Sequence, residues 1–158
     1  MVCELRFRED FLLFRDWFLA ILMEHCLEAL WDVERVKPRI DMHVTTLDRR
    51  EIDVVVSCRG RRICIELKEA NMEKAIKQAI GYLDSGSCDY AYVAIDAHVY
   101  TVLDYVRTKP ELIKEAINRG IGIVAARDKV IVFRAFKRKD AARKYANLLE
   151  LVKRVEGG

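Results

Sequence analysis

The clearest pattern in the chain is a pair of apolar stretches, residues 51–58 and 61–68, both rich in valine and isoleucine. Only Arg59-Gly60 separates them, and a glycine-containing connection of two residues is typical of a β-hairpin turn. Charged side chains occur inside both stretches as well as at their ends. The pattern therefore predicts two antiparallel strands that carry buried charges.

Helical and strand-like segments alternate along the rest of the chain. Apolar residues recur with helical spacing over residues 9–31, and Pro38 requires that this helix ends before it. Asn71 is a suitable cap for the helix that follows the hairpin. The remaining expected elements are a strand at 39–46, a helix from 71 to about 84, a strand at 90–96, a helical region interrupted at Pro110 and closed by Gly120, strands at 121–126 and 130–136, and a helix over roughly 139–154. The αβββαβαββα order predicts a single α/β domain, 1–158, with a mixed β-sheet flanked by helices on both faces.

A two-residue turn fixes the register of the hairpin. Asp53 then lies directly opposite Glu66, with Cβ atoms roughly 4.5–5.5 Å apart, and Lys68 shares their face because the side chains of a strand alternate. The apolar side chains expected on the other face are Ile52, Val54, Val56, Ile63, Ile65 and Leu67. A three-residue loop with a bulge at Gly60 is the alternative, and it would place the two carboxylates on opposite faces.

Two carboxylates and an ammonium among β-branched residues are costly to bury unless they are paired or bind a metal. Asp53 and Glu66 on adjacent strands form a hard-oxygen site that suits Mg²⁺ or Mn²⁺. Such an ion activates water and neutralises charge at an attacked phosphorus, and Lys68 could orient the water and stabilise the developing charge. The alternative is a buried salt-bridge cluster of the same three residues without a metal.

A second motif follows on the next predicted helix. Gln78, the only glutamine in the chain, precedes Tyr82 by one helical turn on the same face. Asp53, then Glu66-Leu67-Lys68, then Gln78-Ala79-Ile80-Gly81-Tyr82 together resemble the PD-(D/E)XK nuclease superfamily, and the Gln-x-x-x-Tyr element resembles its RecB and lambda-exonuclease branch. The resemblance covers roughly residues 24–82, and Ile52 stands where the family has a proline. It implies a restriction-endonuclease-like fold with an αβββαβ core, here extended by a C-terminal β-hairpin and helix.

The resemblance also implies roles for individual residues. Asp53 and Glu66 would hold the metal together with the backbone carbonyl of Leu67, and Lys68 would be catalytic. Gln78 and Tyr82 would grip a phosphate or support the carboxylates. Many members add an acid from the first helix, for which Glu24 is the candidate metal ligand and Glu28 the rival, although either can equally be surface charge.

The net charge of +3 does not by itself indicate a nucleic-acid partner, but the distribution of basic residues is suggestive. Residues expected to lie against a phosphate backbone are Arg59, Arg61 and Arg62 at the hairpin tip and Lys74 and Lys77 on the helix after it. Solvated surface charge is the alternative interpretation. The chain has no helix-turn-helix or zinc-finger pattern that would read a base sequence.

The five cysteines include no Cys-x-x-Cys pair, so a zinc or iron–sulfur site is not expected. Their odd number and the absence of a signal peptide favour reduced thiols in a cytoplasmic protein. His25 and His43 are expected to be structural or exposed, whereas His98 opens a helix at the C-terminal end of a strand and could approach the site. No apolar stretch near the start is long and uncharged enough to span a membrane. A charged content of 34% with few amides resembles the surface of a thermophile's protein.

These observations predict a Mg²⁺- or Mn²⁺-dependent nuclease that hydrolyses DNA phosphodiester bonds in repair, recombination or defence, with RNA as the alternative substrate. One alternative is a homodimeric endonuclease similar to Holliday-junction resolvases. Another is a nuclease-fold subunit that has lost activity and serves in DNA binding or assembly. A lone domain of this size would gain DNA-binding surface as a homodimer or in a larger nuclease complex.

Overall fold

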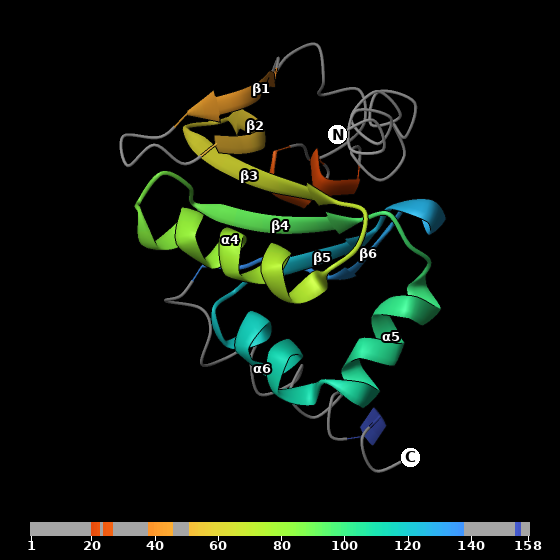
Figure 1. Cartoon of the computed structure of the whole chain (residues 1–158). Coiled ribbons are helices and arrows are strands. Elements are labelled where there is room, and N and C mark those ends of the chain that lie inside the picture. Colours follow the sequence, from red (N-terminus) through yellow and green to blue (C-terminus); the bar gives the residue numbers. More distant parts are fainter. Residues whose placement is uncertain (1–19, 23, 27–37, 46–50, 138–153, 156–158) are drawn as a thin grey trace.

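A six-stranded mixed β-sheet organises the computed structural model, which describes residues 20–22, 24–26, 38–45, 51–137 and 154–155 (Figure 1). The elements within these ranges are β1 (Arg39–Thr45), β2 (Glu51–Cys58), β3 (Arg61–Lys68), α4 (Met72–Asp84), β4 (Tyr90–Ile95), α5 (Val99–Thr108), α6 (Pro110–Asn118), β5 (Gly122–Ala125), a 3₁₀ turn (Ala126–Asp128) and β6 (Val130–Phe133). This arrangement confirms the predicted α/β class. The predicted helices over 9–31 and 139–154 lie almost entirely outside the described residues.

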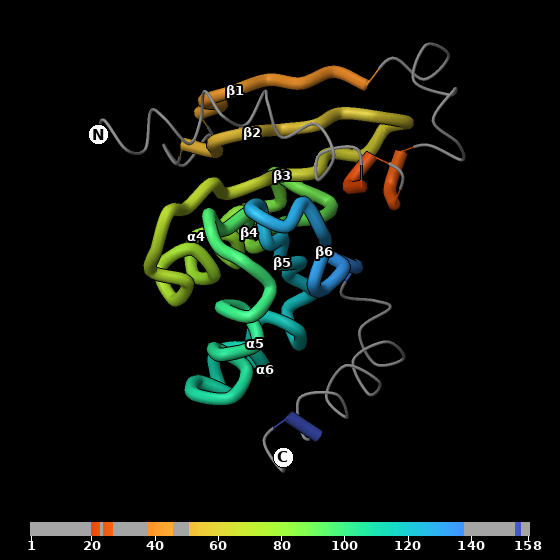
Figure 2. Tube along the Cα trace, turned by 90° about the vertical axis from the view of Figure 1, so that its right-hand side faces the viewer, coloured from red at the N-terminus to blue at the C-terminus, as the bar shows by residue number. Residues whose placement is uncertain are grey.

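The strands follow each other across the sheet in chain order, from β1 to β6. The pairs β1–β2, β2–β3 and β5–β6 are antiparallel, whereas β3–β4 and β4–β5 are parallel. Helix α4 connects the first parallel pair, and α5 and α6 connect the second. Since both crossovers advance in the same direction, right-handed connections require all three helices to cover one face, as Figures 1 and 2 show.

The turn between β2 and β3 contains two residues, as predicted. Arg59 and Gly60 have φ angles of 48° and 73°, the left-handed pair that a type I′ turn requires. The strands pair Cys58 with Arg61 and Val54 with Ile65. This is the register that excludes the three-residue loop.

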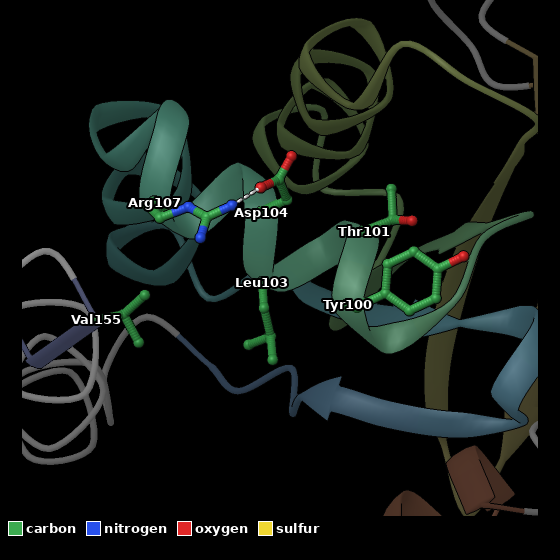
Figure 3. Close-up of a pocket in the computed structure, with 6 residues that line it drawn as sticks. All are labelled: Tyr100, Thr101, Leu103, Asp104, Arg107 and Val155. Atoms are coloured by element: carbon green, nitrogen blue, oxygen red, sulfur yellow. Dashed lines mark hydrogen bonds and ion pairs between the residues drawn. The ribbon is translucent and has the colours of Figure 1, made fainter. Parts of the chain in front are cut away.

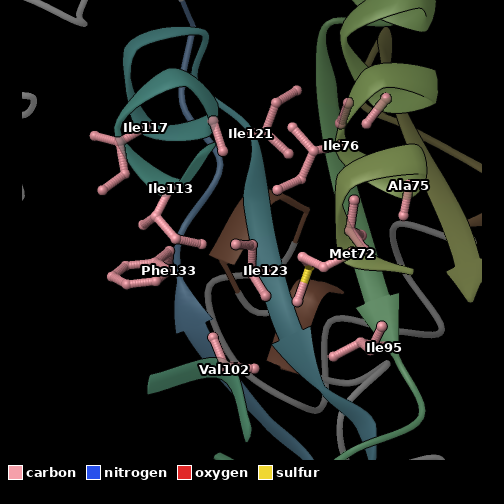
Figure 4. Close-up of a cluster of buried hydrophobic side chains, with 14 of the residues drawn as sticks. Met72, Ala75, Ile76, Ile95, Val102, Ile113, Ile117, Ile121, Ile123 and Phe133 are labelled. Atoms are coloured by element: carbon pink, nitrogen blue, oxygen red, sulfur yellow. The ribbon is translucent and has the colours of Figure 1, made fainter. Parts of the chain in front are cut away.

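Apolar side chains fill both faces of the sheet. The helical face packs Met72 and Ile76 of α4 against Ile95 and Ile123 of the central strands, and α6 adds Ile113 (Figure 4). The opposite face is covered by the described part of the N-terminal helix, whose core residues are Ile21, Leu22 and Cys26. Every described helix falls short of the length and apolarity that a membrane crossing needs.

Local signals in the sequence account for the helix ends. The Asn71 side chain accepts a hydrogen bond from the amide of Lys74, 3.1 Å away, and caps α4 as predicted. Pro110 occupies the first turn of α6, where its missing N–H costs nothing. Gly120, with φ 79°, terminates the helical region.

Four cysteines form two disulfides, Cys26–Cys58 and Cys64–Cys88, and Cys3 lies outside the described residues. The prediction of reduced thiols is therefore wrong for these four. Spacing along the chain gave no signal, because each bond joins elements that only the tertiary fold brings together. Disulfides also occur inside the cells of hyperthermophiles, so their presence does not identify a compartment.

Candidate functional site

Ionisable side chains form a row across β1, β2 and β3. Strand β1 pairs Met42 with Val54, and β2 pairs Val54 with Ile65. Extending each register by one position places His43 beside Asp53 and Asp53 opposite Glu66. Asp53 and Glu66 each expose 4% of their surface to solvent, so both residues are buried as predicted.

The Asp53 carboxylate replaces a backbone partner at the end of the β2–β3 ladder. Its Oδ2 accepts a hydrogen bond from the amide of Leu67 at 2.9 Å. Regular pairing of the two strands stops at Val54, and Ile52 packs with Val55 and Tyr82. The prediction that Ile52 joins the apolar face of Val54 is therefore wrong, because β2 separates from β3 at this point and continues paired with β1 alone.

Helix α4 brings the Tyr82 hydroxyl to Glu66. The phenolic oxygen lies 2.5 Å from Glu66 Oε2 and 2.9 Å from the carbonyl oxygen of Glu51. The ring itself is buried, with 2% of its surface exposed. Tyr82 therefore links α4 to both strands at the level of the carboxylates, which is the supporting position that the Gln-x-x-x-Tyr motif predicts.

Glu66 is the strongly perturbed acid of the row. Its burial, and after that the neighbouring Asp53 carboxylate, raise the pKa of Glu66 to about 8, whereas the Tyr82 hydroxyl and the Lys68 ammonium act to lower it. Two neighbouring carboxyl groups are therefore buried together. Because they repel each other when both are ionised, binding of a proton or a cation between them is favoured.

His43 and Glu51 extend the row to the protein surface. His43 Nδ1 lies 2.7 Å from Glu51 Oε1, and one ligand atom from each of these residues and from Asp53 fit within 4.8 Å of one another. His43 adopts a left-handed φ of 54°, which is uncommon for a residue with a side chain. The sequence predicts only a structural or exposed histidine at position 43, since the register of His43 against Asp53 cannot be derived from the chain.

Lys68 ends β3 beside the carboxylates. Its carbonyl oxygen accepts a hydrogen bond from the amide of Asp96 at 2.8 Å, which fixes its backbone to the end of β4. The Lys68 ammonium is close enough to lower the pKa of Glu66. This attraction between Lys68 and Glu66 is expected both for a metal site and for the salt-bridge cluster that is the alternative interpretation.

Gln78 lies one helical turn before Tyr82 on α4. Its Oε1 atom is buried and has no hydrogen-bond partner. A buried polar atom without a partner costs free energy, so such atoms are commonly satisfied by water or by a ligand.

Glu24 lies on the other face of the sheet. Its carboxylate oxygen is 2.7 Å from Arg134 Nε, and its neighbours Ile21, Leu22 and Cys26 pack against the face opposite the carboxylates. The prediction of Glu24 as a metal ligand is therefore wrong in this structure, because helix periodicity did not reveal which face of the sheet the helix covers. Its rival Glu28 is outside the described residues.

His25 has the structural role expected for it. Its Nε2 lies 2.6 Å from the Tyr92 hydroxyl oxygen, and its ring packs beside Tyr90. Its carbonyl oxygen accepts a hydrogen bond from Arg61 Nη1 at 2.9 Å. Arg61 thus anchors the hairpin tip to the N-terminal helix.

The predicted nucleic-acid contacts separate into two groups. Arg59, Arg61 and Arg62 are exposed at the hairpin tip, and six residues of extended strand place that tip about 20 Å from Asp53. Lys74 and Lys77 are exposed on the first half of α4, at the end of the molecule where β3 finishes. An ion pair of 3.2 Å joins Lys77 to Glu73.

A surface hollow on α5 is remote from the carboxylates. It measures about 520 Å³ and lies along α5, where an ion pair between Asp104 and Arg107 forms one edge (Figure 3). Its lining residues are Tyr100, Thr101, Leu103, Asp104, Arg107 and Val155, none of which belongs to β2, β3 or α4. His98, at the start of α5, contacts Asp128 at 2.8 Å and is not part of the row.

No protein-family model matches the chain, and no curated protein matches it. A solved structure of a protein of unknown function from Silicibacter pomeroyi is similar over 75% of this chain and 79% of its own length, with 17% sequence identity and a TM-score of 0.42.

Proposed function

We propose that this chain is a metal-dependent nuclease of the PD-(D/E)XK type, with a restriction-endonuclease-like fold, that hydrolyses DNA phosphodiester bonds. The observation that carries the proposal is the pair of buried carboxylates, Asp53 and Glu66, at one level of adjacent strands. The raised pKa of Glu66 indicates that protein groups alone do not balance this pair. RNA is the alternative substrate.

The donor atoms fit Mg²⁺ or Mn²⁺. Asp53 and Glu66 provide carboxylate oxygens, and the backbone carbonyl of Leu67 lies between Glu66 and Lys68. Oxygen donors without sulfur suit these hard ions. When bound, the ion would supply charge neutralisation at the attacked phosphorus and activation of water.

The residues around the carboxylates have separate tasks in this proposal. Lys68 orients the attacking water and stabilises negative charge that develops on the phosphate. Tyr82 holds Glu66 through its hydroxyl, 2.5 Å away. The Gln78 carboxamide, whose Oε1 lacks a hydrogen-bond partner, is available to water or to the substrate.

DNA would follow the hairpin in this proposal. A distance of about 20 Å between Asp53 and the hairpin tip corresponds to about six base pairs at 3.4 Å per pair. Arg59 and Arg62 would then contact phosphates at one end, with Lys74 and Lys77 at the other. A homodimer or a larger complex would extend this surface, and a Holliday-junction-resolvase-like dimer remains the alternative within the same chemistry.

The biological setting is proposed only in outline. A DNA nuclease of this kind would act in repair, recombination or defence, and it would act in the cytoplasm. The two disulfides agree with that location in a hyperthermophile, whose intracellular proteins are often rich in disulfides.

A cleavage assay tests the proposal directly. Linear duplex, single-stranded and branched DNA, and an RNA of the same sequence, are incubated with Mg²⁺ or Mn²⁺. We expect cleavage by the wild-type chain, a loss of about 10²-fold or more in Lys68→Ala, and full activity in Lys114→Ala, a lysine of α6 that pairs with Glu111 of the same helix. Preference for branched DNA would favour the resolvase alternative. Failure to cleave any substrate, without metal binding by calorimetry, would indicate an inactive binding or assembly subunit.

A further inference from the structure

The disulfide Cys64–Cys88 connects the two elements that hold the candidate site. Cys64 lies on β3, two residues before Glu66, and therefore on the same face of the strand. Cys88 lies six residues after Tyr82, in the segment between the end of α4 and β4. The bond thus joins the strand that carries Glu66 to the segment that follows the last turn of α4.

This disulfide and the Tyr82 ring belong to one packed unit. Ile52, Val55, Cys64 and Tyr82 form a separate small core, against which Cys88 also packs. The earlier turns of α4 contact a different cluster, through Met72, Ala75, Ile76 and Ala79. Ile80 and Leu83 near the end of α4 also border that larger cluster, so Tyr82 is the residue of α4 whose buried contacts lie in the small core, beside the disulfide.

We propose that Cys64–Cys88 is a positioning element that holds the Tyr82 hydroxyl on Glu66, so that the metal affinity of the site depends on whether this bond is closed. The inference rests on the metal site of the proposed function. Opening the bond frees the last turn of α4 from its covalent connection to β3, and the 2.5 Å contact between Tyr82 and Glu66 is lost. Groups that support metal ligands commonly change metal affinity by about 10- to 100-fold.

A dithiol would open this bond by ordinary exchange. The S–S bond breaks, two S–H bonds form, and the dithiol supplies two electrons and two protons as it closes to a cyclic disulfide. Cys88 borders a surface hollow of about 160 Å³, together with Leu83, Asp89, Phe136 and Lys137. A small thiol therefore has a route to this bond.

Cys26–Cys58 provides a matched control. It spans 32 residues of sequence compared with 24 for Cys64–Cys88, so the two bonds constrain the unfolded chain to a similar extent. Its cysteines pack on the opposite face of the sheet and are 2% and 5% exposed. Loss of this bond would affect stability without touching Tyr82.

Calorimetric titration with Mn²⁺ tests the proposal in the full chain. We expect Tyr82→Phe and the double variant Cys64→Ser/Cys88→Ser each to raise the Kd by about 10-fold, and their combination to raise it by no more than about the same factor. Cys26→Ser/Cys58→Ser should stay within about 2-fold of wild type. The proposal would be overturned if the increases in Kd multiply in the combined variant. It would also be overturned if the two disulfide variants raise the Kd equally.

A second measurement does not depend on metal binding. It also does not depend on whether the Cys64→Ser/Cys88→Ser variant folds. In the Cys26→Ser/Cys58→Ser variant the Cys26–Cys58 bond is already absent, so dithiothreitol opens Cys64–Cys88 and leaves the other site unchanged. The ¹³Cζ resonance of Tyr82 in the metal-free protein, assigned by its absence in Tyr82→Phe, should shift when the bond opens. An unchanged resonance would overturn the proposal. A shifted resonance in a protein that binds no Mn²⁺ would support the positioning role and count against the proposed function alone.

Discussion

The Tyr82 hydroxyl oxygen lies 2.5 Å from Glu66 Oε2, and it also lies 2.9 Å from the Glu51 carbonyl oxygen. A phenol has one proton, so it cannot donate fully to both acceptors. The single Tyr82 proton is therefore shared between the Glu66 carboxylate and the Glu51 carbonyl. Donation from Tyr82 lowers the pKa of Glu66 by less than burial and the Asp53 carboxylate raise it, so this pKa is about 8 and Glu66 carries a proton at neutral pH.

The pH dependence of stability follows from this protonation. The unfolded chain loses the Glu66 proton near the ordinary value of 4.5, whereas the folded chain keeps it to about pH 8. Between these values the folded state binds more protons, so the metal-free protein should lose stability as pH rises, by at most about 1.4 kcal/mol per pH unit. Urea unfolding between pH 5 and pH 8.5 measures the trend. The decline should be reduced in Glu66→Gln, and an equal decline in that variant would assign it to other groups.

Metal binding should release a proton in the same pH range. A carboxylate must be deprotonated to bind a divalent ion, so at pH 7 each Mg²⁺ or Mn²⁺ should displace about one proton from Glu66. Release should decrease above pH 8, where the carboxyl group is already ionised in the metal-free protein. Calorimetry in buffers of different ionisation enthalpy measures the number of protons. Release near zero at pH 7 would mean that Glu66 is not the group that binds the ion.

The hairpin was predictable because its determinants are local. The two residues of the turn set the register, and that register brings Asp53 and Glu66 together. The cap at Asn71 and the position of Tyr82 on α4 follow from the same short-range rules. These signals act over a few residues, so they can be read without knowledge of the rest of the fold.

The features that could not be predicted depend on contacts between distant segments. His43 reaches the row because β1 pairs with β2 in one particular register, which the intervening loop does not specify. Glu24 faces Arg134 because the N-terminal helix covers the other side of the sheet. The Cys64–Cys88 bond forms because the chain returns from α4 to begin β4 beside β3. In each case the sequence contained the residue but no signal for its partner.

Removing one negative charge from the carboxylate pair should separate stability from function. Asp53→Asn keeps an oxygen that can accept the Leu67 amide, but it removes the charge that repels ionised Glu66. We expect the metal-free variant to be more stable than wild type at pH 8.5, on the order of 1 kcal/mol, while Mg²⁺ binding and cleavage are lost. Thermal unfolding and calorimetry measure the two effects. Asp41→Asn, which removes an exposed carboxylate paired with Arg39, should change neither. A destabilised Asp53→Asn protein would contradict the repulsion on which the metal site is argued.

The length of DNA that the protein engages should depend on the hairpin tip. Arg59 lies about 20 Å from Asp53, and Arg62, which pairs with Ser57, lies about 13 Å from it along the strand. A 20-base-pair duplex can therefore contact both arginines and the carboxylates together, whereas a five-base-pair duplex cannot reach Arg59. Asparagine tolerates the left-handed φ of 48° at position 59, so Arg59→Asn combined with Arg62→Gln removes two charges with little backbone strain. Fluorescence anisotropy with Ca²⁺ in place of Mg²⁺ should show a larger loss of binding for the long duplex than for the short one. The slope of log K against log salt should fall by about 1.8, or 0.9 for each phosphate contact. Arg107→Gln on α5 serves as the matched control. Equal losses for both duplexes would place the DNA on a different surface.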